Sequence, residues 1–165
     1  MDILSIFRSQ YYATLAMLKQ AISVCPADLW DDHQDRNRFW HLSYHALFYT
    51  HLYLSTSDDK FVAWDNHRED YQFLGLKPWP PHDLPQIGEP YTPEETLAYL
   101  DFCWKYVDAQ LTELNLEAPS GFSWQPFNKF ELQIYNIRHL QQHTGELMER
   151  LGSRAQIDVN WVGKV

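Results

Sequence analysis

The sequence predicts an all-α fold, a four-helix bundle with a long crossover between its second and third helices. Four stretches place apolar residues close to a helical period, and strong start and stop signals separate them. No convincing pair of alternating stretches indicates strands. The 165 residues are about one domain's worth of chain, so a single domain over residues 1–165 is expected.

Two helices are predicted in the first third of the chain. Residues 3–24 carry apolar side chains at near-helical spacing, and Pro26 stops this first helix. An acidic, polar lead-in then gives way to a dense apolar run from Phe39 to Leu54, which predicts the second helix.

Residues 56–91 differ in character and predict a long ordered crossover. Prolines break any long helix there: Pro78, Pro80, Pro81, Pro85 and Pro90. We expect one short helix, around residues 61–73. Aromatic side chains keep the segment too apolar for a solvated linker, and they indicate either a wall that shields a site and receives an apolar substrate or a simple cap: Trp64, Tyr71, Phe73 and Trp79.

The last two helices have clear boundaries. Thr92 is an N-cap, Pro93 takes the first helical position and Glu95 completes a capping box, so the third helix is expected to run from there to about Leu116. The fourth is predicted over residues 127–151 and ends at Gly152, and the tail adds one extended piece. The crossover can return the chain to either end of the bundle, so the up-down order stays open.

Composition excludes several classes of function. A formal net charge of -9 argues against binding to nucleic acid, which needs clustered Lys and Arg. No apolar run approaches the roughly 20 residues of a membrane span, and the start of the chain lacks signal-peptide features, so a cytoplasmic protein without a membrane partner is expected. Cys25 and Cys103 stand far apart and indicate neither a disulfide nor an activated nucleophile.

The histidines carry the chemical signal. His139 and His143 are four residues apart in the fourth helix, so both rings project from one face and can chelate one ion, with a third ligand from another helix. In the second helix, His41 and His45 share an apolar stripe, whereas His51 points elsewhere. Buried histidines that hydrogen-bond to backbone or carboxylate groups would explain the same spacing.

Neighbouring residues refine this hypothesis. Gly145 indicates close packing or space for a ligand. Glu146 lies on the same helix face as both histidines. It could accept a hydrogen bond that orients an imidazole, serve as a fourth ligand, or be an ordinary solvated glutamate. The chain has neither the Glu-x-x-His pairs of ferritin-like di-iron sites nor the Cys-x-x-Cys-His of c-type haem. The remaining histidines are expected at the surface, the last two with some chance of lining the pocket: His33, His67 and His82.

Two segments carry a family resemblance. "FWHLSYHALFYTHLYL" together with "ELQIYNIRHLQQHTGEL" resembles the DinB/YfiT-like superfamily of proposed metalloenzymes, and the similarity spans essentially the whole chain. The resemblance implies a four-helix bundle in which His45, His139 and His143 hold a divalent metal, with zinc or nickel the most strongly suggested. His41 falls outside this triad, at the pocket rim or as an outer neighbour. Gly145-Glu146 stands where many members have Gly-Gln.

The resemblance also implies a chemistry. Three protein ligands leave a position for water or substrate, which suits a hydrolase, and relatives that transfer low-molecular-weight thiols make an S-transferase an equal expectation. The substrate would be a small molecule. The sequence identifies no general acid or base, although Tyr44, Tyr49 and Glu146 lie near enough in helical projection to be tested. The alternative is a non-catalytic helical protein that binds metal for stability or forms a homodimer.

Overall fold

The computed structural model describes residues 2–112 and 114–165, and over these residues it contains helices and no strand. This confirms the predicted all-α class. The elements are α1 (Ile3–Val24), α2 (Ala27–Trp30), α3 (Phe39–Leu54), the 3-10 turn η1 (Asp58–Lys60), α4 (Pro93–Leu111), α5 (Lys129–Arg150) and the π-helical turn η2 (Leu151–Ala155).

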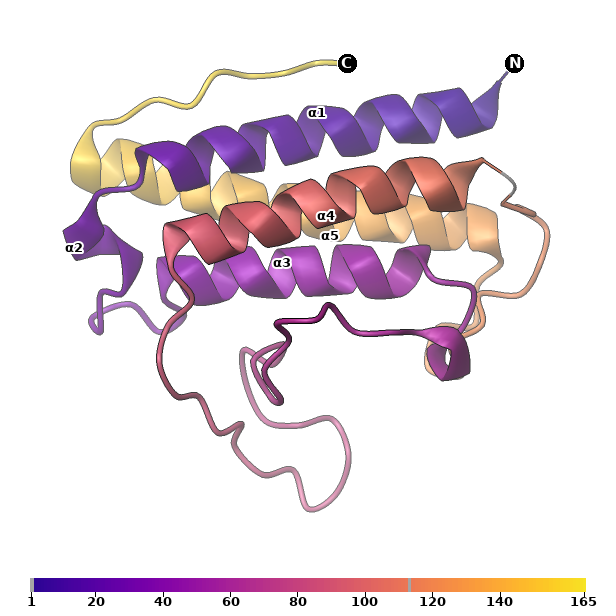
Figure 1. Cartoon of the computed structure of the whole chain (residues 1–165), viewed down its shortest axis with the longest axis horizontal. Coiled ribbons are helices and arrows are strands. Elements are labelled where there is room, and N and C mark those ends of the chain that lie inside the picture. Colours follow the sequence, from indigo (N-terminus) through magenta and orange to yellow (C-terminus); the bar gives the residue numbers. More distant parts are fainter. Residues whose placement is uncertain (1, 113) are drawn as a thin grey trace.

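Four long helices, α1, α3, α4 and α5, lie side by side along the long axis of the molecule (Figure 1). α1 and α3 each pack mainly against α4 and α5 and touch one another little, so they are diagonal partners. In Figure 1, α3 and α4 run from left to right, whereas α1 and α5 run from right to left. Because α3 and α4 run in the same direction, the chain between them must return along the whole length of the helices. The crossover does this.

α3 is buried along almost its whole length, as expected for a helix that is apolar all round. Two of its residues, His45 and Tyr49, are only partly buried, and they follow one another on the same face one turn apart. His45 and Tyr49 are therefore the side chains through which the centre of α3 reaches the surface.

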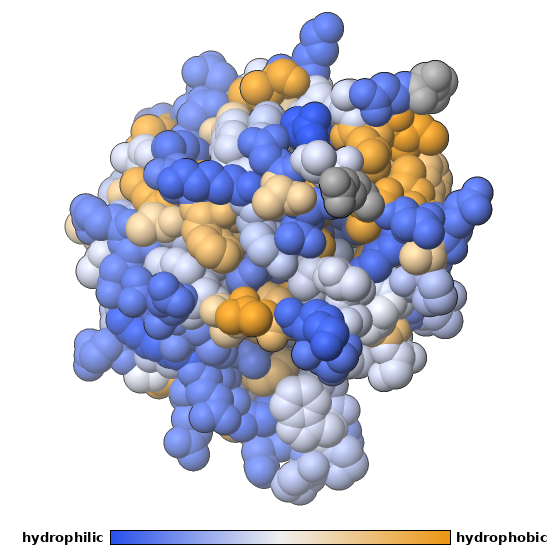
Figure 2. Space-filling view, turned by 45° about the vertical axis from the view of Figure 1, so that its right-hand side comes forward, coloured by the Kyte–Doolittle hydropathy of each residue, from blue (hydrophilic) through white to orange (hydrophobic). Residues whose placement is uncertain are grey.

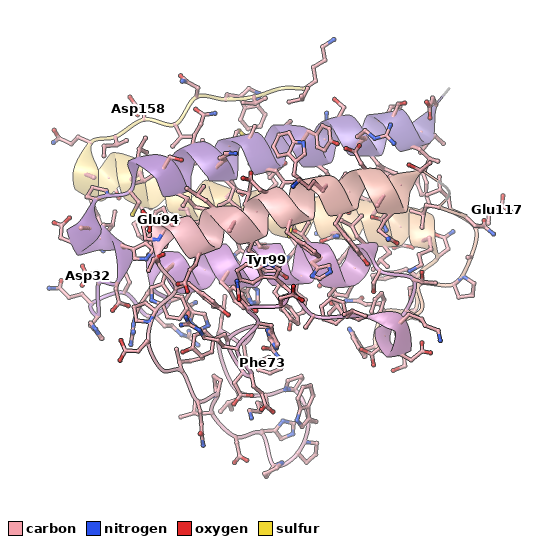
Figure 3. The ribbon with its side chains drawn as sticks, viewed as in Figure 1. Asp32, Phe73, Glu94, Tyr99, Glu117 and Asp158 are labelled. Carbon is pink, nitrogen blue, oxygen red and sulfur yellow. The ribbon has the colours of Figure 1, made fainter. Side chains whose placement is uncertain are left out.

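Aromatic rings fill much of the core and attach the crossover to the helices. Trp40 on α3 is fully buried and packs against Tyr71, with ring centroids 5.6 Å apart. Trp64 stacks on Tyr99 of α4 at 4.6 Å, and Tyr99 lies between α4 and α3 in Figure 3. The rest of the crossover projects below the helices as a lobe in Figures 1 and 2.

The short helix expected around residues 61–73 is absent. The segment instead makes separate turns, in which the amide of His67 donates to the carbonyl of Trp64 and the amide of Phe73 to that of Asp70. Asp70 has a φ of 73°, in the left-handed region, which a right-handed helix cannot continue. The regular structure that does form is η1, directly before this stretch.

Helix ends differ from the predicted ones where side chains bind the backbone. The capping box at Thr92 and Glu95 is confirmed. α4 ends at Leu111, short of the predicted Leu116, and the Asn115 side chain then accepts the Glu117 amide in a turn that competes with helix. α5 begins two residues later than predicted because Asn128 caps it, accepting the Glu131 amide at 2.9 Å.

The C-terminal segment also departs from the predicted boundary. Gly152 lies inside η2 and does not end the helix, and the left-handed residue that follows the turn is Gln156, with a φ of 57°. Beyond it the tail is extended, as expected, and returns along α1 (Figure 1). The side chain of Gln10 donates to the carbonyl of Gly163, and the amide of Asn160 donates to the side chain of Gln20.

Surface and cysteine chemistry agree with the composition. Hydrophilic side chains cover much of the face in Figure 2, with apolar ones gathered in a patch at the upper right and scattered elsewhere. Among the helices of residues 2–112 and 114–165, none combines the length and apolar character of a membrane crossing. Cys25 and Cys103 are both free thiols, so the absence of a disulfide is confirmed.

Candidate metal centre

The packing of α3 on α5 brings three histidines together. His45 is a partly buried residue in the middle of α3, and His139 and His143 lie on successive turns of α5. One nitrogen from each ring lies within 4.8 Å of the others. The structure thus joins the helical pair that the spacing predicted to the third histidine that the family resemblance implied.

The contacting atoms are the three Nε2 nitrogens. His139 Nε2 lies 3.1 Å from His45 Nε2 and 3.1 Å from His143 Nε2. Nitrogens bound to one tetrahedral zinc ion at 2.0–2.1 Å are about 3.3 Å apart. These two separations are close to this value, and all three nitrogens lie within 4.8 Å of one another, so one ion fits between the rings after side-chain adjustment.

Two of the rings have their tautomers set by outer partners. His45 Nδ1 donates to the main-chain oxygen of Gln72 at 2.6 Å, and His143 Nδ1 donates to Glu146 Oε2 at 3.1 Å. An imidazole in its neutral form has one N–H, so in that form each of these rings carries the proton on Nδ1 and presents a lone pair at Nε2. Metal-binding histidines commonly have this outer support.

His139 is the ring between these two lone pairs. Its Nε2 faces both, yet a neutral ring can place only one N–H there, and its Nδ1 is buried without a hydrogen-bond partner among the described residues. Without a cation, one lone pair is left facing another nitrogen lone pair at 3.1 Å, which is unfavourable. A divalent ion would accept all three lone pairs, so the donor set fits a metal.

Burial keeps the rings ready to bind. Desolvation of the ring, and to a lesser extent the electrostatic effect of the nearby His139, holds the pKa of His45 well below its usual value. Desolvation, and to a lesser extent the electrostatic effect of the nearby His143, lowers the pKa of His139 to about 4. Both rings are therefore neutral near pH 7, the state in which imidazole binds a metal.

Glu146 has the orienting role proposed from its position on the helix. Partial burial acts to raise the pKa of its carboxyl group, but hydrogen bonds from Gln142 and His143, with the charge of Arg150, bring the pKa below its usual value. Glu146 is thus a carboxylate near pH 7. It contacts the outer nitrogen of His143, so it supports the ring instead of acting as an inner ligand.

Of the other candidate residues, one lies at the site and two lie away from it. Tyr49 lines the site, with its ring centroid 4.8 Å from His45 and 5.5 Å from His139. His41 is turned away, and its Nε2 donates to the main-chain oxygen of Tyr71 at 2.9 Å. Tyr44 is also remote, because its hydroxyl hydrogen-bonds to His67 Nδ1 at 2.6 Å on another side of α3.

A pocket of about 540 Å³ adjoins the three histidines through Tyr49 and Gln72. Its aromatic lining comes from three parts of the chain: α3 (Phe48, Tyr49 and Tyr53), the crossover (Phe61, Phe73 and Trp79) and the loop before α5 (Trp124). Figure 3 shows Phe73 in the crossover below α3. Of the four crossover aromatics expected as a wall, Phe73 and Trp79 therefore line the pocket, whereas Trp64 and Tyr71 pack on the core.

Three other expectations need correction or completion. Gly145 has no atom within 4 Å of the place a Cβ would occupy, so nothing approaches closely there. His67 is half-buried in its contact with Tyr44, not a surface residue, and neither it nor His82 lines the pocket. His33 and His82 are exposed, as expected.

Gln72 is the functional residue that the sequence did not reveal. It supports His45 through a main-chain carbonyl, a group that every residue has, so no side-chain pattern could have identified it. Trp124 likewise lines the pocket from a loop in which no sequence pattern marks it.

Comparison with known proteins does not identify this chain. Protein-family models, curated proteins and solved structures each yield no significant match. The site must therefore be interpreted from its own geometry.

Proposed function

We propose that this protein is a metal-dependent enzyme with a three-histidine divalent-metal centre, built on a four-helix bundle of the DinB/YfiT-like type. His45, His139 and His143 hold the ion, and the reaction is hydrolysis of a small molecule or transfer of a low-molecular-weight thiol to one. One observation carries the proposal: three Nε2 atoms converge, and outer hydrogen bonds set two of them as lone pairs.

Zinc or nickel suits three imidazole nitrogens, and the nitrogens alone do not discriminate between them. When bound, such an ion lowers the pKa of a water or a thiol, which is the activation that both reactions need. The residues around the site have supporting roles. The carbonyl of Gln72 and the carboxylate of Glu146 orient two ligands, and Tyr49 walls the centre on the pocket side.

Metal content tests the proposal first. Protein purified without a polyhistidine tag is expected to contain about one divalent ion per chain by mass spectrometry, because three neighbouring nitrogens can chelate one ion. After the ion is removed with a chelator, added zinc or nickel should raise the melting temperature. Protein without stoichiometric metal whose melting temperature does not respond to either ion would contradict the proposal.

The metal-loaded protein can then be assayed with ester, amide and electrophile substrates, with and without added thiols. Turnover that requires thiol supports the transferase, and turnover without thiol supports the hydrolase. Stoichiometric metal with no turnover on any substrate would favour a non-catalytic metal-binding protein.

Replacing Glu146 by Ala is expected to weaken metal affinity by about 10–100-fold, because His143 loses the acceptor that orients its ring. Competition with a chromogenic chelator measures the change. Glu149→Ala removes an exposed carboxylate from the same helix and should leave the affinity unchanged. Equal effects of the two substitutions would show that only overall charge matters.

A further inference from the structure

The pocket beside the three histidines has a chemical preference of its own. We propose that it binds the aromatic body of a small molecule whose far end carries a positively charged amine. This inference rests on the proposed function for the reacting end of the molecule, near the histidines, and on the pocket alone for the amine end.

The walls select for a flat apolar group. Phe73 and Trp79 meet at 5.3 Å in an edge-to-face contact, and they stand opposite the aromatic residues of α3 in the lining. Trp79 and Trp124 remain about half exposed, at 54% and 50%, so their ring surfaces are accessible to a ligand. Aromatic faces attract both planar apolar groups and cations.

Charge in the lining has one sign. Asp58 is the single charged residue that lines the pocket, and its carboxylate forms no ion pair within residues 2–112 and 114–165. The next carboxylate, Asp59, pairs with Lys60, and Lys77 pairs with Asp70 at 2.7 Å. A ligand in the pocket thus meets an unpaired anion and no free cation, which disfavours acidic ligands.

A second acceptor reinforces this preference. Gln72 lines the pocket, and its side-chain Oε1 is buried without a hydrogen-bond partner among the described residues. An unsatisfied buried acceptor costs about 1–3 kcal/mol. An N–H donor on the ligand would remove that cost.

The order of residues along α3 sets the ligand's direction. Tyr49 lies one turn beyond His45 and Tyr53 lies two turns beyond it, about 11–12 Å along the axis. Asp58, in η1, follows the end of α3 (Figure 1). A ligand that spans the pocket thus has one end at Tyr49, beside His45, and the other at Asp58.

Three probes that share a naphthalene ring test the proposal: 2-naphthylmethylamine, 2-naphthylmethanol and 2-naphthoate. Calorimetric titrations use the purified protein and then the chelator-treated protein, so that binding to a metal is separated from binding to the pocket. The amine is expected to bind at least about tenfold more tightly than the carboxylate in both forms. Trp79→Ala should weaken all three probes.

Adjacent carboxylates provide a matched pair of variants. Asp58→Asn should weaken the amine by about two- to fivefold and leave the alcohol unchanged. Asp59→Asn makes the same change in charge one residue away, outside the lining, and should affect neither probe. Carboxylate binding as tight as amine binding, equal effects of the two variants, or no binding of any probe would overturn the proposal.

The outcome is independent of the metal test. Chelator-treated protein that prefers the amine supports the pocket proposal even if the purified protein contains no metal. Stoichiometric metal without a preference for the amine overturns this inference and leaves the proposed metal centre intact.

Discussion

His143→Ala is expected to abolish stoichiometric metal binding. The substitution removes one of three nitrogens that lie within 4.8 Å of one another and leaves two ligands, His45 and His139. Loss of an inner ligand should weaken affinity by more than the roughly 10–100-fold expected for an outer partner. Mass spectrometry of the purified variant should find only a small fraction of one ion per chain, and added zinc or nickel should no longer raise its melting temperature.

His33→Ala is the matched control, because it removes an exposed imidazole remote from the site. The circular dichroism of both variants should match that of the unaltered protein, which excludes unfolding as the cause of metal loss. Full metal occupancy in His143→Ala would remove this residue from the ligand set, and loss of metal in His33→Ala would show binding outside the centre.

Trp40→Ala should destabilise the protein by about 3–5 kcal/mol. The indole is fully buried, packs on Tyr71 and donates its N–H to Asp31 at 2.7 Å. Its removal leaves a cavity and an acceptor without this donor at the point where the crossover meets α3. Urea unfolding followed by circular dichroism measures the loss.

Trp161→Ala is the corresponding control, because this indole is 73% exposed in the C-terminal tail. Its free energy of unfolding should change by less than about 0.5 kcal/mol. A loss in Trp40→Ala no greater than that in Trp161→Ala would show that the crossover does not depend on this contact.

The Trp40 substitution also links stability to the site. Tyr71 precedes Gln72, whose carbonyl orients His45, so loosening the crossover at Tyr71 should reduce metal affinity as well. The long segment between α3 and α4 therefore returns the chain for a parallel helix, supports one histidine and lines the pocket.

The parts of the site that the sequence predicts are those formed by residues close together in the chain. The pair His139 and His143 follows from a four-residue spacing, because helical geometry places such residues on one face. The capping box at Thr92 and Glu95 is equally local. Assignment of His45 over His41 came from the family resemblance, since both lie on the same stripe of α3 and spacing does not separate them.

The errors arose where longer-range contacts outweigh local pattern. A helix at residues 61–73 fits local composition, but the segment is held by Trp64 on Tyr99 and Tyr71 on Trp40 in a path with a left-handed residue. Gly145 suggested a close approach that the packing of α5 does not produce.

By itself the sequence determined the helical class, the four long helices to within a few residues and the chelating pair on α5, because each depends on residues within a few turns of one another. Only the tertiary structure decided that α3 and α4 run in the same direction, that His45 faces the pair, that the carbonyl of Gln72 accepts from it and that Asp58 lines the pocket. These features join segments many residues apart, and packing of the whole chain sets them.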